Sequence, residues 1–472
     1  MKKTVLYCHL INGRSRKRKG QVSDREENGL PGTRECMKTD ILIVGSGCSG
    51  LYCALNLPRE KQILIVTKSE VTKSDSFLAQ GGMCMWKAES DYDSYFEDTM
   101  KAGHYENDKR SVEIMIKSSP EVVKDLVECG ADFERDEEGN LAFTKEGGHS
   151  DKRIIFHKDV TGKEITSKLL EKVRTLPNVT ILENTTMVDI IGKDNTCYGA
   201  WLRGEDQKLF CVKADYTVFA TGGIGGLYKH STNYRHLTGD ALAIALKHGI
   251  GLKNINYVQI HPTTFFSRNP KERCFLISES VRGEGAKLYD KDMNRFVDEL
   301  LPRDILTGHI LKQMEKQQTE FVWEDLRPIP REEVENHFPN ILEHCKSEGY
   351  DVFEECIPVV PAQHYFMGGI EVDYESATTM KHLYAVGETA CNGVHGKNRL
   401  ASNSLLESLV FAKRAALKMA KEYETLDSAQ ADALEADTDL SVYEDAGKLA
   451  EEYHDMVWEA IRKADAQAKE QQ

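Results

Sequence analysis

Short apolar runs that end at glycine-rich turns and lead into helix-forming segments are the main pattern of the chain. The first run, residues 40–44, predicts a buried strand that enters a turn over 45–50 and then a helix over 51–57. A second apolar run over 63–67 predicts the next strand. Strand and helix patterns alternate from about 38 to 254, and this alternation predicts an α/β fold with a parallel sheet.

The turn over 45–50 reads Gly-Ser-Gly-Cys-Ser-Gly, a glycine spacing typical of Rossmann-like dinucleotide sites. Its glycines permit a tight turn, let a pyrophosphate approach bare backbone, and let the helix pack closely on the strand. Lys68 stands at the end of the second strand, where an acidic residue usually binds the adenosine ribose of NAD. This departure argues against an ordinary NAD site. It leaves two alternatives open, a partner for a 2′-phosphate or a flavin dinucleotide held differently at its ribose.

Two more glycine turns and one polar loop add to the candidate ligand-binding pattern. Glycines follow apolar runs within 74–82 and 219–223, as expected where backbone amides approach a flat ring system and its phosphates. The polar loop 395–407 leads into a helix-forming run, so donors gather where a helix N-terminus is positive. Taken alone, this loop is more often an ordinary capped helix start. The glycine turn over 45–50 makes an anion site the better interpretation.

These separated motifs, in this order, resemble the succinate dehydrogenase and fumarate reductase flavoprotein superfamily, and within it most closely the L-aspartate oxidases. The resemblance covers about residues 38–425. It implies an α/β fold, in which a Rossmann-like FAD-binding domain carries an inserted α+β capping domain and a short C-terminal helical region. The implied bounds are 37–254 with 366–430 for the discontinuous FAD-binding domain, 255–365 for the capping domain and 431–472 for the helical region.

The resemblance also implies which residues hold FAD. Membrane-linked members of the superfamily attach their flavin through a histidine five residues before the glutamine or glutamate of the Ala-Gln-Gly-Gly motif, and Asp75 occupies that position here, so the flavin should be noncovalent. Lys68 is assigned to the adenosine side, Asp240 to the ring region, and Glu388 to the ribityl or ribose hydroxyls. The implied set is Gly45, Ser46, Gly47, Cys48, Ser49, Gly50, Lys68, Asp75, Ser76, Phe77, Leu78, Ala79, Gln80, Gly81, Gly82, Thr221, Gly222, Gly223, Asp240, Glu388, Ser404 and Leu405.

A dicarboxylate beside a flavin needs cationic or multiply donating partners, because an unpaired charge in a dry cleft costs several kcal/mol. By resemblance, Arg399 and His364 bind carboxylate groups, while His261 and Ser278 donate to the other end of the substrate. Glu146 lies in a loop of the L-aspartate oxidase form. It could pair with the substrate ammonium group, which succinate lacks.

Arg303 occupies the acid/base position of the family, and Glu279 and Arg282 are spaced at i and i+3 as expected for a proton relay. A guanidinium is a poor base because its pKa exceeds about 12, so neighbours must shuttle charge. The implied reaction is FAD-dependent oxidation of L-aspartate to iminoaspartate, with O2 or fumarate as electron acceptor. It implies a place in NAD biosynthesis, with the imine passed to quinolinate synthase. The alternatives are a soluble fumarate reductase and a flavin-binding scaffold that has lost catalysis.

Composition fits a large enzyme. The 472 residues are 40% apolar, enough for about two or three domains with extended cores. No apolar run approaches the roughly 18 residues that span a bilayer, so no membrane partner is expected. The formal net charge of −15 gives no reason to expect nucleic acid. The oligomeric state is left open.

Cysteine spacing and the N-terminal segment complete the expectations. The 12 cysteines show no Cys-x-x-Cys pair, so neither a zinc ribbon nor an iron–sulfur cluster is predicted, and no metal. We expect reduced thiols in a cytoplasmic protein. Residues 1–36 are polar and lack the apolar core of a secretory signal. They are predicted to be a disordered appendage, with Met37 as a natural start.

Overall fold

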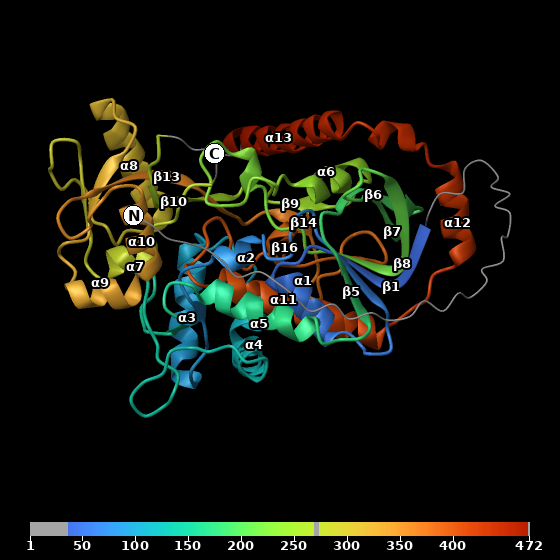
Figure 1. The fold of residues 1–472 in the computed structure, drawn as a ribbon, viewed down its shortest axis with the longest axis horizontal. Coiled ribbons are helices and arrows are strands. Elements are labelled where there is room, and N and C mark those ends of the chain that lie inside the picture. The colour runs from blue at the N-terminus through green and yellow to red at the C-terminus, as the bar shows by residue number, and fades with distance from the viewer. Residues whose placement is uncertain (1–35, 269–272, 471–472) are drawn as a thin grey trace, which may run out of the picture. The chain divides into compact units, whose positions relative to one another are not determined.

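The central sheet has the strand order β5-β2-β1-β8-β7-β6, and β15 also pairs with β8 (Figure 1). The computed structural model describes residues 36–268 and 273–470. The strands of this sheet are β1 (Cys36–Val44), β2 (Ile63–Val66), β5 (Val179–Leu182), β6 (Thr186–Lys193), β7 (Thr196–Arg203), β8 (Leu209–Phe219) and β15 (Leu383–Ala385). Strands β1, β2, β5, β8 and β15 pair in parallel, whereas β6, β7 and β8 pair antiparallel. The predicted parallel sheet is therefore extended by an antiparallel edge.

The β1 strand is apolar throughout its second half because both of its faces are buried. Ile41 and Ile43 face a first core, and Leu42 and Val44 face a second one. Helices α1 (Cys48–Asn56), α3 (Glu89–Ala102), α4 (Lys109–Glu128), α5 (Thr161–Val173) and α11 (Ser404–Lys421) enclose the first core. The second core lies between the sheet and helices α6 (Asp240–Lys247) and α13 (Ala446–Glu470). The sheet is thus covered on both faces, as the predicted α/β class requires.

A second sheet has the order β10-β13-β12-β11 and pairs antiparallel throughout. Its strands are β10 (Val258–Phe265), β11 (Lys287–Tyr289), β12 (Val322–Asp325) and β13 (Ile357–Phe366). With it pack α7 (Glu279–Gly283), α8 (Arg303–Gln317), α9 (Arg331–His337) and α10 (Pro339–Ser347) around a third core. These elements occupy the segment predicted to be the capping domain, although the exact domain bounds stay a prediction.

The remaining short elements include two small sheets, β16-β14-β9 and β3-β4. The short elements are α2 (Asp75–Leu78), β3 (Met83–Cys84), β4 (Ile154–Ile155), β9 (Leu252–Lys253), β14 (Gly369–Glu371), β16 (Ala390–Cys391), and the 3-10 turns η1 (Gly225–Leu227) and η2 (Gly387–Thr389). Strand β15 lies beside β8, which confirms the predicted return of the chain to the first sheet after the inserted segment. None of the helices within 36–268 and 273–470 combines the length and the apolar character that crossing a membrane requires.

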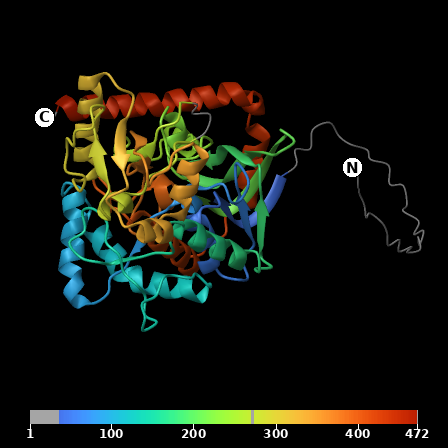
Figure 2. The same ribbon diagram turned by 60° about the vertical axis from the view of Figure 1, so that its left-hand side comes forward.

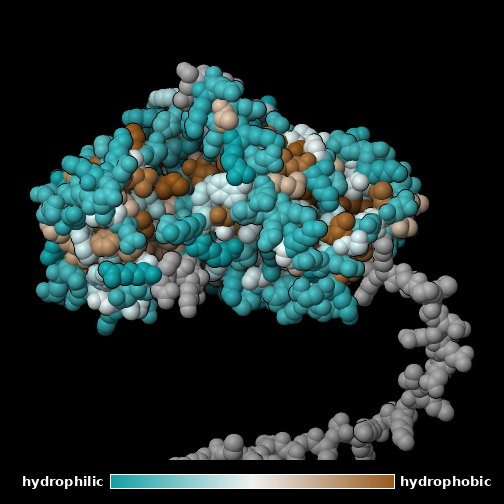
Figure 3. Space-filling model, turned by 90° about the horizontal axis from the view of Figure 1, so that it is seen from above, coloured by the Kyte–Doolittle hydropathy of each residue, from teal (hydrophilic) through white to brown (hydrophobic). Residues whose placement is uncertain are grey.

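The C-terminal region is helical, as predicted. It comprises α12 (Ser428–Asp437), η3 (Leu440–Tyr443) and α13, which lies beside α6 in both ribbon views (Figures 1 and 2). Residues of α13 at helical spacing, Leu449, Tyr453, Val457 and Ile461, are buried in the second core. The face shown in Figure 3 is mainly hydrophilic, with hydrophobic residues in small groups. Such groups are ordinary on protein surfaces.

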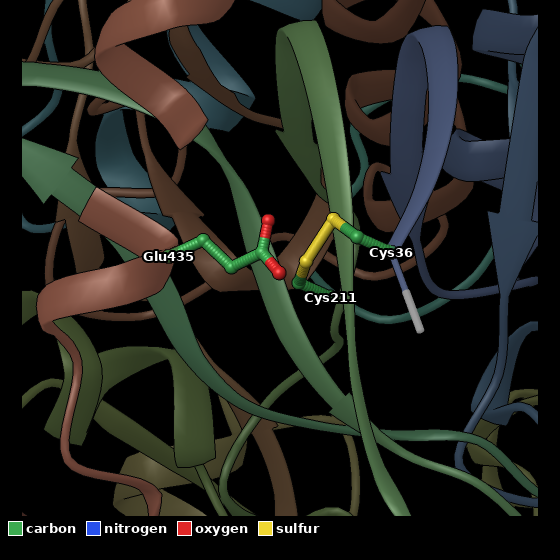
Figure 4. A group of neighbouring side chains, drawn as sticks. All are labelled: Cys36, Cys211 and Glu435. Atoms are coloured by element: carbon green, nitrogen blue, oxygen red, sulfur yellow. A yellow bond between two sulfur atoms is a disulfide. The ribbon is translucent and has the colours of Figure 1, made fainter. Parts of the chain in front are cut away.

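Cys36 and Cys211 form a disulfide between β1 and β8 (Figure 4). The prediction of reduced thiols is wrong for this pair, because the parallel register places the two residues opposite each other with a Cα–Cα distance of 4.6 Å. Nine other cysteines in the described part of the chain are free. Because Cys36 belongs to β1, the predicted appendage cannot extend to residue 36, and 1–35 lies outside the described residues.

Candidate active site

A large cavity lies at the carboxyl ends of the parallel strands, where Val44, Val66 and Ala220 reach its wall. Ligands of open α/β sheets bind at this edge. The cavity encloses about 1690 Å³ of empty space, open solvent at its mouth included. Its lining runs from Lys68 and Asp240 to His261, His364 and Arg399, so residues assigned to the cofactor and to the substrate share one cavity.

The glycine turn after β1 brings backbone to the cavity. Gly45 has a φ of +120°, and a Cβ there would lie 2.0 Å from the carbonyl oxygen of Ala220. A Cβ at Gly50 would lie 2.2 Å from the carbonyl oxygen of Gly45. Only glycine fits at either position. Gly47 caps α1 without a side-chain hydrogen bond, while the N–H of Cys48 donates to Ser76 Oγ at 3.0 Å. The positive end of the helix faces the cavity, where it would favour a phosphate.

Lys68 and Asp240 form an ion pair with an Nζ–Oδ2 distance of 2.6 Å, and Thr238 Oγ1 donates to Asp240 Oδ1. Both charged residues therefore lie at the same end of the cavity. The end of β2 is where a Rossmann-like fold meets the adenosine ribose, which supports the assignment of Lys68 to the adenosine side. The assignment of Asp240 to the ring region stays a prediction.

Most of the residues assigned to FAD line the cavity, and three do not. Gly50 acts through helix packing, and Gly223 lies beneath Glu388, where a Cβ would come within 2.2 Å of Oε1. Phe77 packs against the first core. These three residues can shape the site, but we do not place them in contact with the cofactor.

Asp75 and Glu388 are half-buried and place two carboxyl groups in the cavity. Asp75 Oδ1 accepts the N–H of Tyr234, and Glu388 Oε1 accepts the N–H of Phe366. Burial raises the pKa of both carboxyls, and the charge of Asp75 raises that of Glu388 further. Asp75 Oδ2 has no hydrogen-bond partner among the described residues. Hydroxyl groups of a dinucleotide would satisfy such acceptors, so these residues fit FAD.

Two histidines and an arginine gather near the second sheet. His261 and His364 lie with ring centroids 5.2 Å apart, and the guanidinium of Arg399 lies 4.6 Å from the ring centroid of Tyr365. His261 Nε2 and Arg399 Nε have no hydrogen-bond partner among the described residues. Burial and nearby arginines lower the pKa of both histidines, so their rings are neutral, and they lower that of Arg399 to about 10. The unpaired Nε–H of Arg399 suits an anionic ligand, and His261 Nε2 suits one in the tautomer that carries its proton on Nε2.

Ser278 lies at the edge of this group. It precedes α7 and accepts the N–H of Ser280 at 3.3 Å, and it lines the cavity. The hydroxyl is thus part of a helix cap, which also fixes its position beside the ligand.

Arg303 is held from two sides. Its Nε donates to Glu279 Oε2 at 2.5 Å, and its Nη1 donates to Gln259 Oε1 at 3.0 Å. Although burial alone would raise the pKa of Glu279, the charges of Arg303 and Arg282 lower it, so the carboxylate is ionised. The structure thus brings Arg303 and Glu279, two of the three residues predicted to form the relay, into contact; the relay itself stays a prediction.

Arg282 does not reach the cavity. It is 2% exposed, and its Nη1 donates to the carbonyl oxygen of Glu299 at 2.6 Å. Among the described residues its Nε and Nη2 have no partner. The charge of Arg282 still acts on Glu279, but the relay role of Arg282 stays a prediction.

Glu146 is 5% exposed and lines the cavity. Its Oε2 accepts Ser402 Oγ at 2.5 Å, and its Oε1 accepts Ser280 Oγ at 3.1 Å. Burial and the neighbouring Glu279 raise its pKa. A cation placed beside Glu146 would stabilise its ionised form.

Sequence reasoning missed several supporting residues. Gln259 joins Arg303 to the loop of Arg399, because its Nε2 donates to the carbonyl oxygen of Arg399 at 2.8 Å. Ser402 positions Glu146, and Tyr365 lies under Arg399. Gln259, Tyr365 and Ser402 stand in the same motifs as assigned residues, so these motifs could have identified them as site residues.

Comparisons with known proteins agree with this geometry. The FAD binding domain family matches residues 40–405. The L-aspartate oxidase of Clostridium perfringens is 50% identical over 80% of this chain and 86% of its own length, and that of Nostoc sp. is 40% identical over 80% and 67%. FrdA of E. coli quinol fumarate reductase superposes with a TM-score of 0.78 at 28% identity, covering 85% of this chain and 74% of its own. The predicted fold class and resemblance are confirmed, and the chain belongs to the FAD-binding flavoproteins and, within them, to the L-aspartate oxidase family.

Proposed function

We propose that the protein oxidises L-aspartate to iminoaspartate with FAD as cofactor. The observation that carries this function is one cavity in which donors for two carboxylates and a buried acid for an ammonium group surround the space left beside the cofactor residues. The relatives named L-aspartate oxidase support the same substrate.

The carboxylates of the substrate are recognised by residues with unsatisfied donors. Arg399 and His364 bind one end, and His261 with Ser278 binds the other. The free Nε of Arg399 suits a charge-assisted hydrogen bond to a carboxylate. An arginine at this position is more useful than a lysine because its fork holds a planar anion in one orientation.

The amino group of the substrate is recognised by Glu146. Two serine hydroxyls, from Ser280 and Ser402, hold this carboxylate at the cavity. The bound ammonium group and Glu146 form an ion pair. A plain dicarboxylate has no ammonium group and would leave the charge of Glu146 without a partner. This pairing is the basis of selection for L-aspartate over succinate.

FAD, when bound, supplies the acceptor for the hydride that leaves the substrate Cα. Because the imine forms only when the amino group also gives up a proton, we assign the transfer of that proton to Arg303 and Glu279. The hydrogen bonds of Arg303 to Glu279 and Gln259 fix the plane of its guanidinium. Because Glu279 is ionised and accepts a hydrogen bond from Arg303, it can briefly accept a proton from Arg303. Orientation and charge balance are the main contributions of the protein.

The attachment of the flavin is a separate proposal. Asp75 stands where membrane-linked relatives carry their attachment histidine, and a carboxylate does not form that bond, so FAD should be held noncovalently. Acid precipitation of the holoenzyme should release yellow flavin into the supernatant. Flavin that stays with the protein pellet would contradict noncovalent binding.

The cellular setting is also proposed. We place the reaction in the cytoplasm, at the entry to NAD biosynthesis, with quinolinate synthase taking the imine and O2 or fumarate reoxidising the flavin. Nine free thiols in the described part of the chain support a reducing compartment, and the Cys36–Cys211 disulfide is an exception to it.

A peroxide assay tests the proposed oxidation. In air, the purified holoenzyme should form peroxide with L-aspartate, and far less with D-aspartate or succinate. The likeness to FrdA of quinol fumarate reductase favours a second candidate, a fumarate reductase. An enzyme that reduces fumarate with a dye donor but forms no peroxide or imine from L-aspartate would support that candidate instead.

A further inference from the structure

A second cavity adjoins the cofactor cavity at its adenosine end. The two cavities share Lys68, Thr186, Met187 and Asp240 in their linings. The outer side of the second cavity is formed by the first turns of α13, through Ala446, Leu449, Ala450 and Tyr453. The helix that follows the flavin domain in the sequence thus borders the space where the cofactor begins.

The start of α13 is fixed to the sheet by specific contacts. Tyr453 OH donates to the carbonyl oxygen of Val188 on β6 at 2.6 Å. Just before the helix, Arg203 on β7 donates to the carbonyl oxygens of Tyr443 and Glu444. A Cβ at Gly239 would lie 3.7 Å from Val457, so α13 also touches the turn that leads to Asp240. The start of α13 is therefore attached to β6, the strand that also contributes Met187 to both cavities.

The chemistry of this space suits a purine nucleoside. It opens beside Lys68, at the end of β2, where Rossmann-like folds meet the adenosine ribose. Met187 and Leu449 give it apolar walls, and Tyr453 adds an aromatic ring. Flat heteroaromatic ligands bind in such apolar surroundings, with a few polar groups at the edge. Lys68 and Asp240 are the charged groups at the junction, within reach of ribose hydroxyls.

We propose that the N-terminal half of α13 is the outer wall of the adenosine subsite, so that the adenine of FAD lies between β6 and this helix. The family match ends at residue 405, so α13 lies outside it. The proposal rests on FAD binding and not on the identity of the substrate. It gives the C-terminal helix a part in holding the cofactor.

Tryptophan substitutions on α13 test this proposal. Ala450 is exposed and lines the second cavity, so Ala450→Trp should fill the cavity without disturbing the core. Glu451 is its exposed neighbour and is not part of the lining, so Glu451→Trp is the matched control. Apoenzyme is titrated with FAD and with FMN by flavin fluorescence. We expect the dissociation constant for FAD to rise about tenfold or more in Ala450→Trp and to stay unchanged in Glu451→Trp.

FMN lacks the adenosine group and should bind both variants as it binds the parent protein. Equal FAD affinity in the two variants, or an equal loss of FAD and FMN in Ala450→Trp, would overturn the proposal. Should Ala450→Trp not fold, Ala446→Trp repeats the test from the first residue of the helix. At saturating FAD, activity with L-aspartate should equal that of the parent protein in Glu451→Trp. Absence of that activity in the parent protein would contradict the proposed function while leaving the FAD comparison readable.

Discussion

We propose Glu146 as the side chain that distinguishes an amino dicarboxylate from a plain one in this site. Glu146→Gln keeps the shape but removes the charge; one serine still donates to the amide oxygen, and the other must instead accept from the amide N–H. We expect the KM for L-aspartate to rise about tenfold or more, because a buried charge pair is lost, while the KM for fumarate changes little. Steady-state kinetics with both substrates measures this.

Ser280→Ala is the control for Glu146→Gln, because it removes one hydroxyl and leaves the charge. It should affect L-aspartate much less. Parallel increases of KM for L-aspartate and fumarate in Glu146→Gln would contradict the assigned role.

The role of Arg303 depends on the planar geometry of its guanidinium group as well as on its charge. Arg303→Lys keeps a cation but cannot hold Glu279 and Gln259 with the same geometry. The expected kcat falls about 100-fold or more, with a smaller change in KM and with FAD still bound. Arg295→Lys, which changes an arginine bonded to Glu299 away from the cavity, is the control. A kcat of Arg303→Lys close to that of the parent would remove Arg303 from the proton-transfer step.

Glu324 on β12 is fully buried, and neither of its oxygens has a partner among the described residues. Burial and Glu299 raise its pKa to about 8 against the opposing charge of Arg282, and Cys345 also faces it. Because the folded pKa lies above the unfolded value, its stabilisation is present below about pH 4.5 and is lost as the pH rises to about 8.

Between about pH 5 and pH 8, the melting temperature of the parent protein should therefore fall further than that of Glu324→Gln. Thermal unfolding of both proteins at the two pH values measures the difference. Glu333→Gln, an exposed substitution, should show the same fall in melting temperature between the two pH values as the parent. The same fall in Glu324→Gln would mean that Glu324 is ionised in the folded protein.

At the scale of elements, the junction of β1 and α1 tolerates no side chain at Gly50. Gly50→Ala would bring a Cβ within 2.2 Å of the carbonyl oxygen of Gly45, so backbone must shift at a cost of about 1–3 kcal/mol. Its melting temperature and its FAD affinity should both fall.

A methyl group at Gly308 on α8 would meet no atom within 4 Å among the described residues. Gly308→Ala should therefore raise the melting temperature, because alanine stabilises a helix interior by about 0.5–1 kcal/mol relative to glycine. Thermal unfolding that ranks the two variants in the opposite order would contradict this account.

The elements that could be predicted are those whose pattern is local. The strand at 40–44 was recognisable because it is apolar on both faces, and the glycines after it because a turn follows directly. The Cys36–Cys211 disulfide could not be predicted, since its partners are 175 residues apart and meet only through the register of β1 and β8. The pairing of Lys68 with Asp240 likewise depends on how β2 and α6 are placed.

At the scale of the whole molecule, the site assembles residues from distant segments at the edge between two sheets. The resemblance predicted His261, His364 and Arg399, because each stands in a motif, and the structure brings them together at the cavity. It could not predict that Arg282 bonds to Glu299 instead of lining the cavity, or that Gln259 joins Arg303 to the loop of Arg399. Burial and orientation of side chains are tertiary properties that a motif does not carry.

The most direct test of the central claim is the visible spectrum of the holoenzyme under anaerobic conditions. We predict that L-aspartate bleaches the flavin absorbance and that succinate at the same concentration leaves it nearly unchanged. Bleaching by succinate with no response to L-aspartate would contradict the account.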